Sequence, residues 1–145
     1  MASDQIRAGL LHDIGKLAVS NAILDKPGKL TGAEFARVKR HPGITHEVLK
    51  RVAPFRGIVE VAASYHEKLD GSGYYRGLSA ENLSPRARIL AVADIFDTLS
   101  QDRPYRPVMP MERVLSILER ERDDDKLCPE PVAALTELVE KGELR

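Results

Sequence analysis

The stretch His12-Asp13-Ile14-Gly15-Lys16 brings an imidazole, a carboxylate and an ammonium group into one short segment. Imidazole nitrogens and carboxylate oxygens are the mixed ligands that divalent transition metals take. On a helix, Lys16 would share a face with His12 and Asp13, because residues three and four apart are neighbours. An ammonium group in that place can meet a phosphate oxygen. The stretch therefore predicts a metal site for phosphoester chemistry.

Three more potential ligands follow one by one, at His41, His66 and Asp94. A His-Asp pair by itself is better explained as a buried imidazole near a helix end, and each later residue has a similar structural explanation. The combination of all of them favours a site of metal-binding descent.

The composition is typical of a soluble globular protein. The chain has 145 residues, of which 43% are hydrophobic and 30% charged, which predicts one domain over residues 1–145 with its own core. Lys and Arg total 22, as do Asp and Glu, so no net field favours a nucleic-acid polymer or a membrane. An anionic substrate would have to be held by local positive charge or by metal.

Cys128 is the single cysteine, which excludes an intrachain disulfide and a cysteine-based zinc site and suits a reducing cytosol. No apolar run approaches the ~20 residues of a transmembrane helix, and the N-terminus lacks the apolar region of a signal peptide. The predicted location is the cytoplasm, with no membrane segment in this chain.

The fold class is predicted to be all-α, a single helical bundle, because apolar residues recur at helical spacing and no segment alternates like a strand. Thr31 and Glu34 have capping-box spacing, and Ser84 followed by Pro85 is typical of a helix start. The tripeptide at 41–43, His-Pro-Gly, is expected to break a helix. Helices are expected over residues 6–19, 31–40, 44–52, 58–66, 85–99, 111–121 and 131–141.

Five motifs of the chain agree in order and spacing with those of one family. They are His-Asp-Ile-Gly-Lys (12–16), His-Pro (41–42), His-Glu-x-x-Asp-Gly-x-Gly-Tyr (66–74), Val-Ala-Asp-Ile-Phe-Asp (92–97) and Arg-Pro-Tyr-Arg (103–106). Over residues 8 to about 140 the chain resembles the HD-GYP domain, a subgroup of the helical HD-domain metal phosphohydrolases. The resemblance implies a bacterial phosphodiesterase that hydrolyses cyclic di-GMP at a centre of two or three metal ions, often iron or manganese.

The same resemblance implies roles for individual residues. Asp13 would bridge two ions, and Lys16 would meet a phosphate and act with Asp13 in catalysis. Tyr74 stands at the tyrosine after which the family is partly named. The implied metal ligands are His12, Asp13, His41, His66 and Asp94, and the implied substrate-binding residues are Lys16, Tyr74, Arg103 and Arg106.

Such a centre needs no protein nucleophile, because two cations can polarise a phosphodiester and activate water. That agrees with a chain in which no persuasive Ser-His-Asp or Cys-His arrangement is found. Arginine suits the bidentate grip of a phosphate or of a guanine edge. Arg103 and Arg106 are explained equally well as a structural clamp on Asp97 and Asp102.

Two departures from the family pattern bear on the metal count. Tyr65 stands where the family has the first of two adjacent histidines, and we expect it to fill core space rather than to serve as a phenolate ligand. Only eleven residues precede His12, whereas the family has further helices there with another histidine and often a glutamate ligand. Three explanations stay open, each with fewer ions expected here: a fragment, helices supplied by a partner, or a degenerate site.

The leading prediction is a metal-dependent phosphodiesterase that converts cyclic di-GMP to the linear dinucleotide or GMP in second-messenger signalling. One alternative is a degenerate, non-catalytic domain that binds cyclic di-GMP or a signalling partner, such as a diguanylate cyclase or a regulatory domain. A further alternative is a phosphohydrolase for another nucleotide, (p)ppGpp-like or a dNTP. Apolar surface left by missing helices would favour a homodimer.

Overall fold

The structure, a computed structural model, describes residues 2–102 and 107–144. Within these residues the backbone forms α-helices and short 3₁₀-helices, and extended segments pair only at an isolated bridge between Asp70 and Ser79. The predicted all-α class is confirmed. The elements are α1 (Ala2–Leu11), η1 (Ile14–Ala18), α2 (Asn21–Leu24), α3 (Gly32–Val38), α4 (His41–Leu49), η2 (Ala53–Ile58), α5 (Val59–Ala63), η3 (Ala80–Asn82), α6 (Pro85–Ser100), α7 (Met111–Asp123) and α8 (Pro129–Glu140).

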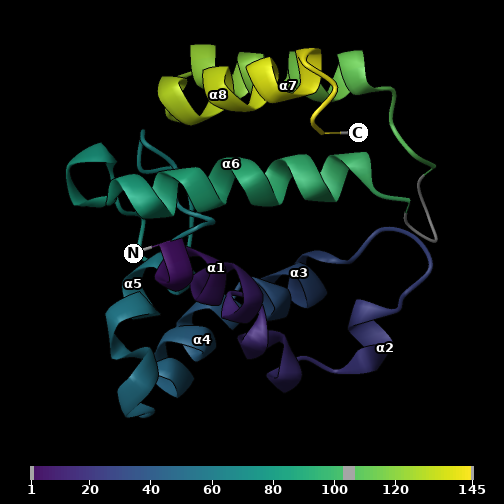
Figure 1. Ribbon diagram of the computed structural model, residues 1–145. Helices are drawn as coiled ribbons and strands as arrows, with labels where there is room; N and C mark the ends of the chain where they lie inside the picture. The colour runs from purple at the N-terminus through teal and green to yellow at the C-terminus, as the bar shows by residue number, and fades with distance from the viewer. Residues whose placement is uncertain (1, 103–106, 145) are drawn as a thin grey trace.

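Helix α6 lies across the middle of the molecule, with α7 and α8 on one side and α1 to α5 on the other (Figure 1). Leu90 of α6 belongs to a core shared with α1, α4 and α5, whereas Ala91 and Val92 belong to a core shared with α7 and α8. Successive helical residues point in different directions, so α6 joins the two cores. Its start is fixed as predicted by Ser84, whose side chain accepts a hydrogen bond from the first turn.

The first helix is shorter than predicted. Helix α1 ends at Leu11, the next two residues form a turn, and Lys16 lies in the 3₁₀-helix η1. This change of course brings Gly15 against α4, where an added Cβ would overlap the carbonyl oxygen of His41. Side chains three apart eclipse in a 3₁₀-helix, so Lys16 still lies over Asp13.

Helix α4 begins at His41, where the sequence predicted a break between helices. Pro42 lies in its first turn, where the missing N–H is not needed. The preceding helix ends at Val38, earlier than predicted, after starting at the predicted capping box of Thr31 and Glu34. The proline therefore starts a helix here and leaves the imidazole of His41 at its N-terminal end.

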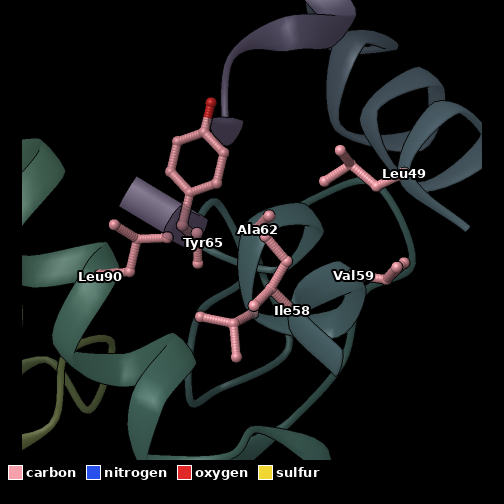
Figure 2. Packing of buried hydrophobic residues seen from close by; sticks show 8 residues of the cluster. Leu49, Ile58, Val59, Ala62, Tyr65 and Leu90 are labelled. Carbon is pink, nitrogen blue, oxygen red and sulfur yellow. The ribbon is translucent and has the colours of Figure 1, made fainter. Parts of the chain in front are cut away.

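The turn after α5 carries Tyr65 and His66. Helix α5 ends at Ala63, so neither residue continues the predicted helix. The ring of Tyr65 packs in a core with Ala62 and Leu90, while its hydroxyl points away from these aliphatic side chains (Figure 2). Tyr65 thereby connects the hydrophobic core to a cluster of polar side chains.

The helices are short by the standard of membrane spans. The longest in the described part of the chain is α6, with 16 residues, fewer than the ~20 that a bilayer requires. Across residues 2–102 and 107–144, no helix combines the length and the apolar character needed to cross a membrane.

Candidate metal centre

The five predicted metal ligands come together from segments far apart in the sequence. Nε2 of His12, in the turn after α1, lies 3.5 Å from Oδ1 of Asp94 in α6. Nε2 of His41, at the start of α4, lies 3.4 Å from Oδ1 of Asp13. The ring centroids of His41 and His66 are 5.2 Å apart. Tertiary packing therefore gathers the predicted residues into one polar cluster.

Thr45 connects the turn that carries His12 to α4 by hydrogen bonds. Its hydroxyl donates to the carbonyl oxygen of His12 at 2.9 Å and accepts from the backbone N–H of Gly15 at 3.0 Å. A Cβ on Gly15 would stand 2.8 Å from both N and Oγ1 of Thr45. Sequence reasoning gave Thr45 no role, because a single threonine in a helix carries no signal of a tertiary hydrogen bond.

Both carboxylate oxygens of Asp13 accept hydrogen bonds within the cluster. Its Oδ2 accepts from Nζ of Lys16 at 2.6 Å, and its Oδ1 accepts from the hydroxyl of Tyr65 at 2.6 Å. Burial raises the pKa of the Asp13 carboxyl, but hydrogen bonds from His41, Lys16 and Tyr65 hold that pKa well below its usual range. Asp13 is therefore ionised at neutral pH, with each of its oxygens already paired.

Tyr65 bridges Asp13 and His41. Its hydroxyl oxygen lies 2.7 Å from Nε2 of His41, and its side chain is only 2% exposed. Burial and the charge of Asp13 raise the pKa of the phenol far above its ordinary value, so the hydroxyl keeps its proton. Tyr65 does fill core space with its ring, as expected. The role of its hydroxyl was missed, because both partners come from distant segments.

Backbone carbonyl groups orient two of the imidazoles. Nδ1 of His12 lies 2.6 Å from the carbonyl oxygen of Gly9, and Nδ1 of His41 lies 2.6 Å from that of Val38. A carbonyl oxygen can only accept, so each Nδ1 carries a proton and each Nε2 faces the cluster, as in metal-binding histidines. Burial lowers the pKa of His12, but hydrogen bonds with Asp94 and Gly9 raise it overall.

His66 and Tyr74 form the aromatic wall of the cluster. Their rings stack with centroids 4.6 Å apart and an interplanar angle of 26°. Burial lowers the pKa of His66 to about 4, so its imidazole is neutral at physiological pH and able to act as a ligand. Burial also raises the pKa of Tyr74 to about 12. Nζ of Lys39 lies 5.4 Å from the Tyr74 ring centroid, a cation–π contact that sequence reasoning missed.

A buried carboxylate shapes the loop that carries Tyr74. Glu67 is 2% exposed and accepts from the backbone N–H groups of Arg76 at 2.8 Å and Leu78 at 2.9 Å. Gly73 lies so close to the chain that an added Cβ would overlap the carbonyl oxygen of His66. These contacts fix the loop against the segment that presents His66.

The donors suit a metal ion in chemistry and in part in spacing. Two ligand atoms ~2.1 Å from a tetrahedral ion lie ~3.4 Å apart. Nε2 of His12 lies 3.5 Å from Oδ1 of Asp94 and 3.6 Å from Oδ2 of Asp13. Among the described residues, no group of three His, Cys, Asp or Glu side chains surrounds a common point closely enough to hold an ion as it stands. The Asp13 carboxylate is a reason for this, because both of its oxygens are turned to Lys16 and Tyr65.

The predicted substrate-binding residues divide into two pairs. Lys16 and Tyr74 lie at the cluster. Arg103 and Arg106 lie outside the described residues. Asp97, an expected partner of the arginine clamp, accepts a hydrogen bond from Gln101 at 2.5 Å.

Known proteins similar to this chain share its family. Residues 2–130 match the HD domain. The chain is 51% identical over 129 residues to 3'3'-cGAMP-specific phosphodiesterase 3 of Vibrio cholerae, an alignment that covers 89% of this chain and 28% of that protein. It is 48% identical over 102 residues to a cyclic di-GMP phosphodiesterase of Pseudomonas aeruginosa, which covers 68% of this chain and 24% of that protein.

A cyclic di-GMP phosphodiesterase of Thermotoga maritima is 41% identical over 114 residues, which covers 77% of this chain and 31% of that protein. The chain thus spans between 24% and 31% of the length of these relatives. The resemblance to HD-GYP domains that the motifs predict is confirmed.

Proposed function

Because the chain belongs to the HD-domain family, we propose that it is a metal-dependent phosphodiesterase that hydrolyses a cyclic dinucleotide. The observation that carries the proposal is the meeting of two imidazole–carboxylate pairs, His12 with Asp94 and His41 with Asp13, beside the ammonium group of Lys16. Phosphohydrolases of this family depend on metal. Iron or manganese is the proposed ion.

The residues that would hold metal are His12, Asp94 and His66, and the sequence predicts Asp13 and His41 as further ligands. When bound, a divalent cation would polarise the phosphodiester and offset the charge that develops on its oxygens. The neutral imidazole of His66 fits this role, since a ligand nitrogen must be unprotonated.

Lys16 and Tyr74 would act on the substrate directly. The Lys16 side chain is 38% exposed while its Nζ is held by Asp13, so a positive charge stands at a fixed position at the edge of the cluster. Such a charge stabilises a phosphoryl oxygen without moving during the reaction. The ring of Tyr74, stacked on His66 and with Lys39 over it, places a cation for a phosphate. Arg103 and Arg106 stay predictions for the second phosphate or the guanine edge.

Cyclic di-GMP is the substrate predicted from the sequence. The relative with 51% identity is named for 3'3'-cGAMP, which makes this second cyclic dinucleotide a direct competitor for the assignment. The bridge formed by Tyr65 between Asp13 and His41 favours the non-catalytic alternative, a domain that binds a cyclic dinucleotide without cleaving it. The single domain, the cytoplasmic location, the homodimer and the cyclase or regulatory partner stay predictions.

The test is turnover by the purified chain loaded with Mn²⁺. Each cyclic dinucleotide is added separately, and the linear dinucleotide and mononucleotide are separated by chromatography. Lys16→Ala is expected to lower kcat/KM by about 10²–10³, the scale seen when one charge-stabilising donor is removed. Lys26→Ala is the matched control, because Lys26 also pairs with a carboxylate, that of Glu34 at 2.7 Å, outside the cluster. Tight binding of the dinucleotide without turnover would instead establish the non-catalytic alternative.

A further inference from the structure

We propose that Tyr65 holds Asp13 and His41 together in place of a metal ion, so that the centre takes a single ion, at the His12–Asp94 pair. The inference deepens the proposed function and rests on it only for the premise that the cluster binds metal. Tyr65 is then a positioning residue that sets how many ions the centre accepts.

The phenol occupies the position that a second ion would need. Its oxygen lies 2.6 Å from Oδ1 of Asp13 and 2.7 Å from Nε2 of His41. An ion bound by the same two atoms would lie about 2.0–2.2 Å from each, in the space that the phenolic oxygen fills. The hydroxyl and a second ion therefore exclude one another.

The Tyr65 ring has little freedom to move aside. It meets the ring of His12 edge-on at 4.6 Å and lies 4.0 Å from that of His66, between centroids. Its side chain is 2% exposed and belongs to the core that includes Leu90. Displacing the hydroxyl would open this packing, which close-packed interiors resist.

Lys16 adds an electrostatic reason. Its Nζ lies 2.6 Å from the other oxygen of Asp13, so this carboxylate already neutralises one positive charge. A divalent ion on the Asp13–His41 pair would stand close to that ammonium group and be repelled by it. Lys16 and Tyr65 therefore pair with both oxygens of the Asp13 carboxylate, and neither oxygen is left for a second ion.

The His12–Asp94 pair differs from the other in its hydrogen bonds rather than in its exposure, since His41 is 1% and Asp13 37% exposed. The side chains of His12 and Asp94 are 20% and 19% exposed, and their facing atoms are 3.5 Å apart. In the part of the chain that the structure describes, no hydroxyl or ammonium group bridges this pair in the way that Tyr65 bridges the other. An ion at this pair would replace the contact between His12 and Asp94 themselves but would not have to displace a bridging hydroxyl.

The test counts ions. Metal-free chain is reconstituted with Mn²⁺ under anaerobic conditions, the ratio of metal to chain is measured by elemental analysis, and the electron paramagnetic resonance spectrum distinguishes an isolated ion from an exchange-coupled pair. The variants are Tyr65→His, which supplies a ligand, and Tyr65→Phe, which removes only the hydroxyl. Tyr75→Phe is the matched control, because Tyr75 is 37% exposed and packs against Gly43.

The wild type and Tyr75→Phe are expected to bind one Mn²⁺ per chain with the spectrum of an isolated ion. Tyr65→His is expected to bind two, with an exchange-coupled spectrum, and Tyr65→Phe to admit a second, weaker ion. A wild type with two coupled ions or with none would overturn the inference, even if neither Tyr65 variant folds. So would a Tyr65→His variant with native circular dichroism and a single ion.

The outcomes separate this inference from the proposed function. A wild type that takes one ion but cleaves no cyclic dinucleotide would end the proposed function and leave the inference standing. An active wild type with two ions would do the reverse.

Discussion

The His12–Asp94 and His41–Asp13 pairs consist of the same two residue types, yet their surroundings differ. The facing atoms are 3.5 Å apart in the first pair and 3.4 Å apart in the second, so spacing does not distinguish them. Only the carboxylate of the second pair accepts hydrogen bonds from a buried phenol and an ammonium group. The comparison teaches that the neighbours of a ligand, as much as the ligand itself, decide whether it is available to a metal.

The most direct test of whether the two pairs differ in metal binding is to remove one histidine from each pair. His12→Ala is expected to weaken Mn²⁺ binding by at least about 100-fold, because loss of a ligand should cost no less than loss of its hydrogen-bonded support. His41→Ala is expected to leave the affinity for the first ion within about tenfold, since His41 faces Tyr65 instead. Isothermal titration of Mn²⁺ into the metal-free variants measures both. Equal losses in the two variants would show that the pairs bind one shared centre.

A second test concerns the close contact between Gly15 and α4, which positions both pairs. Gly15→Ala is expected to lower the free energy of unfolding by about 1–3 kcal/mol, as overpacking does, because its Cβ would overlap the His41 carbonyl oxygen and crowd Thr45. Urea denaturation followed by circular dichroism measures this difference. Gly57→Ala is the control, since an added Cβ there meets nothing within 4 Å, and its effect is expected within about 0.5 kcal/mol. Equal stability of the two variants would mean that the contact between Gly15 and α4 adjusts to the added Cβ with no loss of stability.

The smallest expected effect is a pH dependence of stability that comes from His66. Burial lowers the pKa of His66 to about 4 in the folded chain, so between pH 4 and the ordinary value of 6.5 the unfolded chain binds the extra proton. Stability is therefore lost as the pH falls from about 6.5 to about 4, by about 1–2 kcal/mol once partial exposure is allowed for.

His66→Asn is expected to remove this slope, in denaturation curves recorded with a chelator present so that metal does not compete with protons. The raised pKa of His12 acts in the opposite sense and is common to both proteins, so it cancels in the difference. The lowered pKa of Asp13 acts below this window. An identical slope in the two proteins would contradict the burial of His66 as its cause.

Local sequence signals predicted the parts of the fold that depend on neighbouring residues. The capping box of Thr31 and Glu34 and the start of α6 at Ser84 were right, because a cap is satisfied within one turn. The helix over 6–19 and the break at 41–43 were wrong. The first error involves the contact of Gly15 with α4, which depends on segments that the local pattern does not connect. The second arose because Pro42 lies in the first turn of a helix, where proline is tolerated, instead of ending one.

The sequence by itself determined that the five predicted ligands and Lys16 belong together, through the motifs at 12–16, 41–42, 66–74 and 92–97. Only the tertiary structure decided how these groups are paired, since hydrogen bonds within a cluster depend on positions in space. It placed Thr45 on the backbone of His12 and set the Tyr65 hydroxyl between Asp13 and His41. A tyrosine read in sequence is an aromatic residue that fills space, and it becomes a bridge only where folding sets a buried carboxylate and an imidazole within reach of its oxygen.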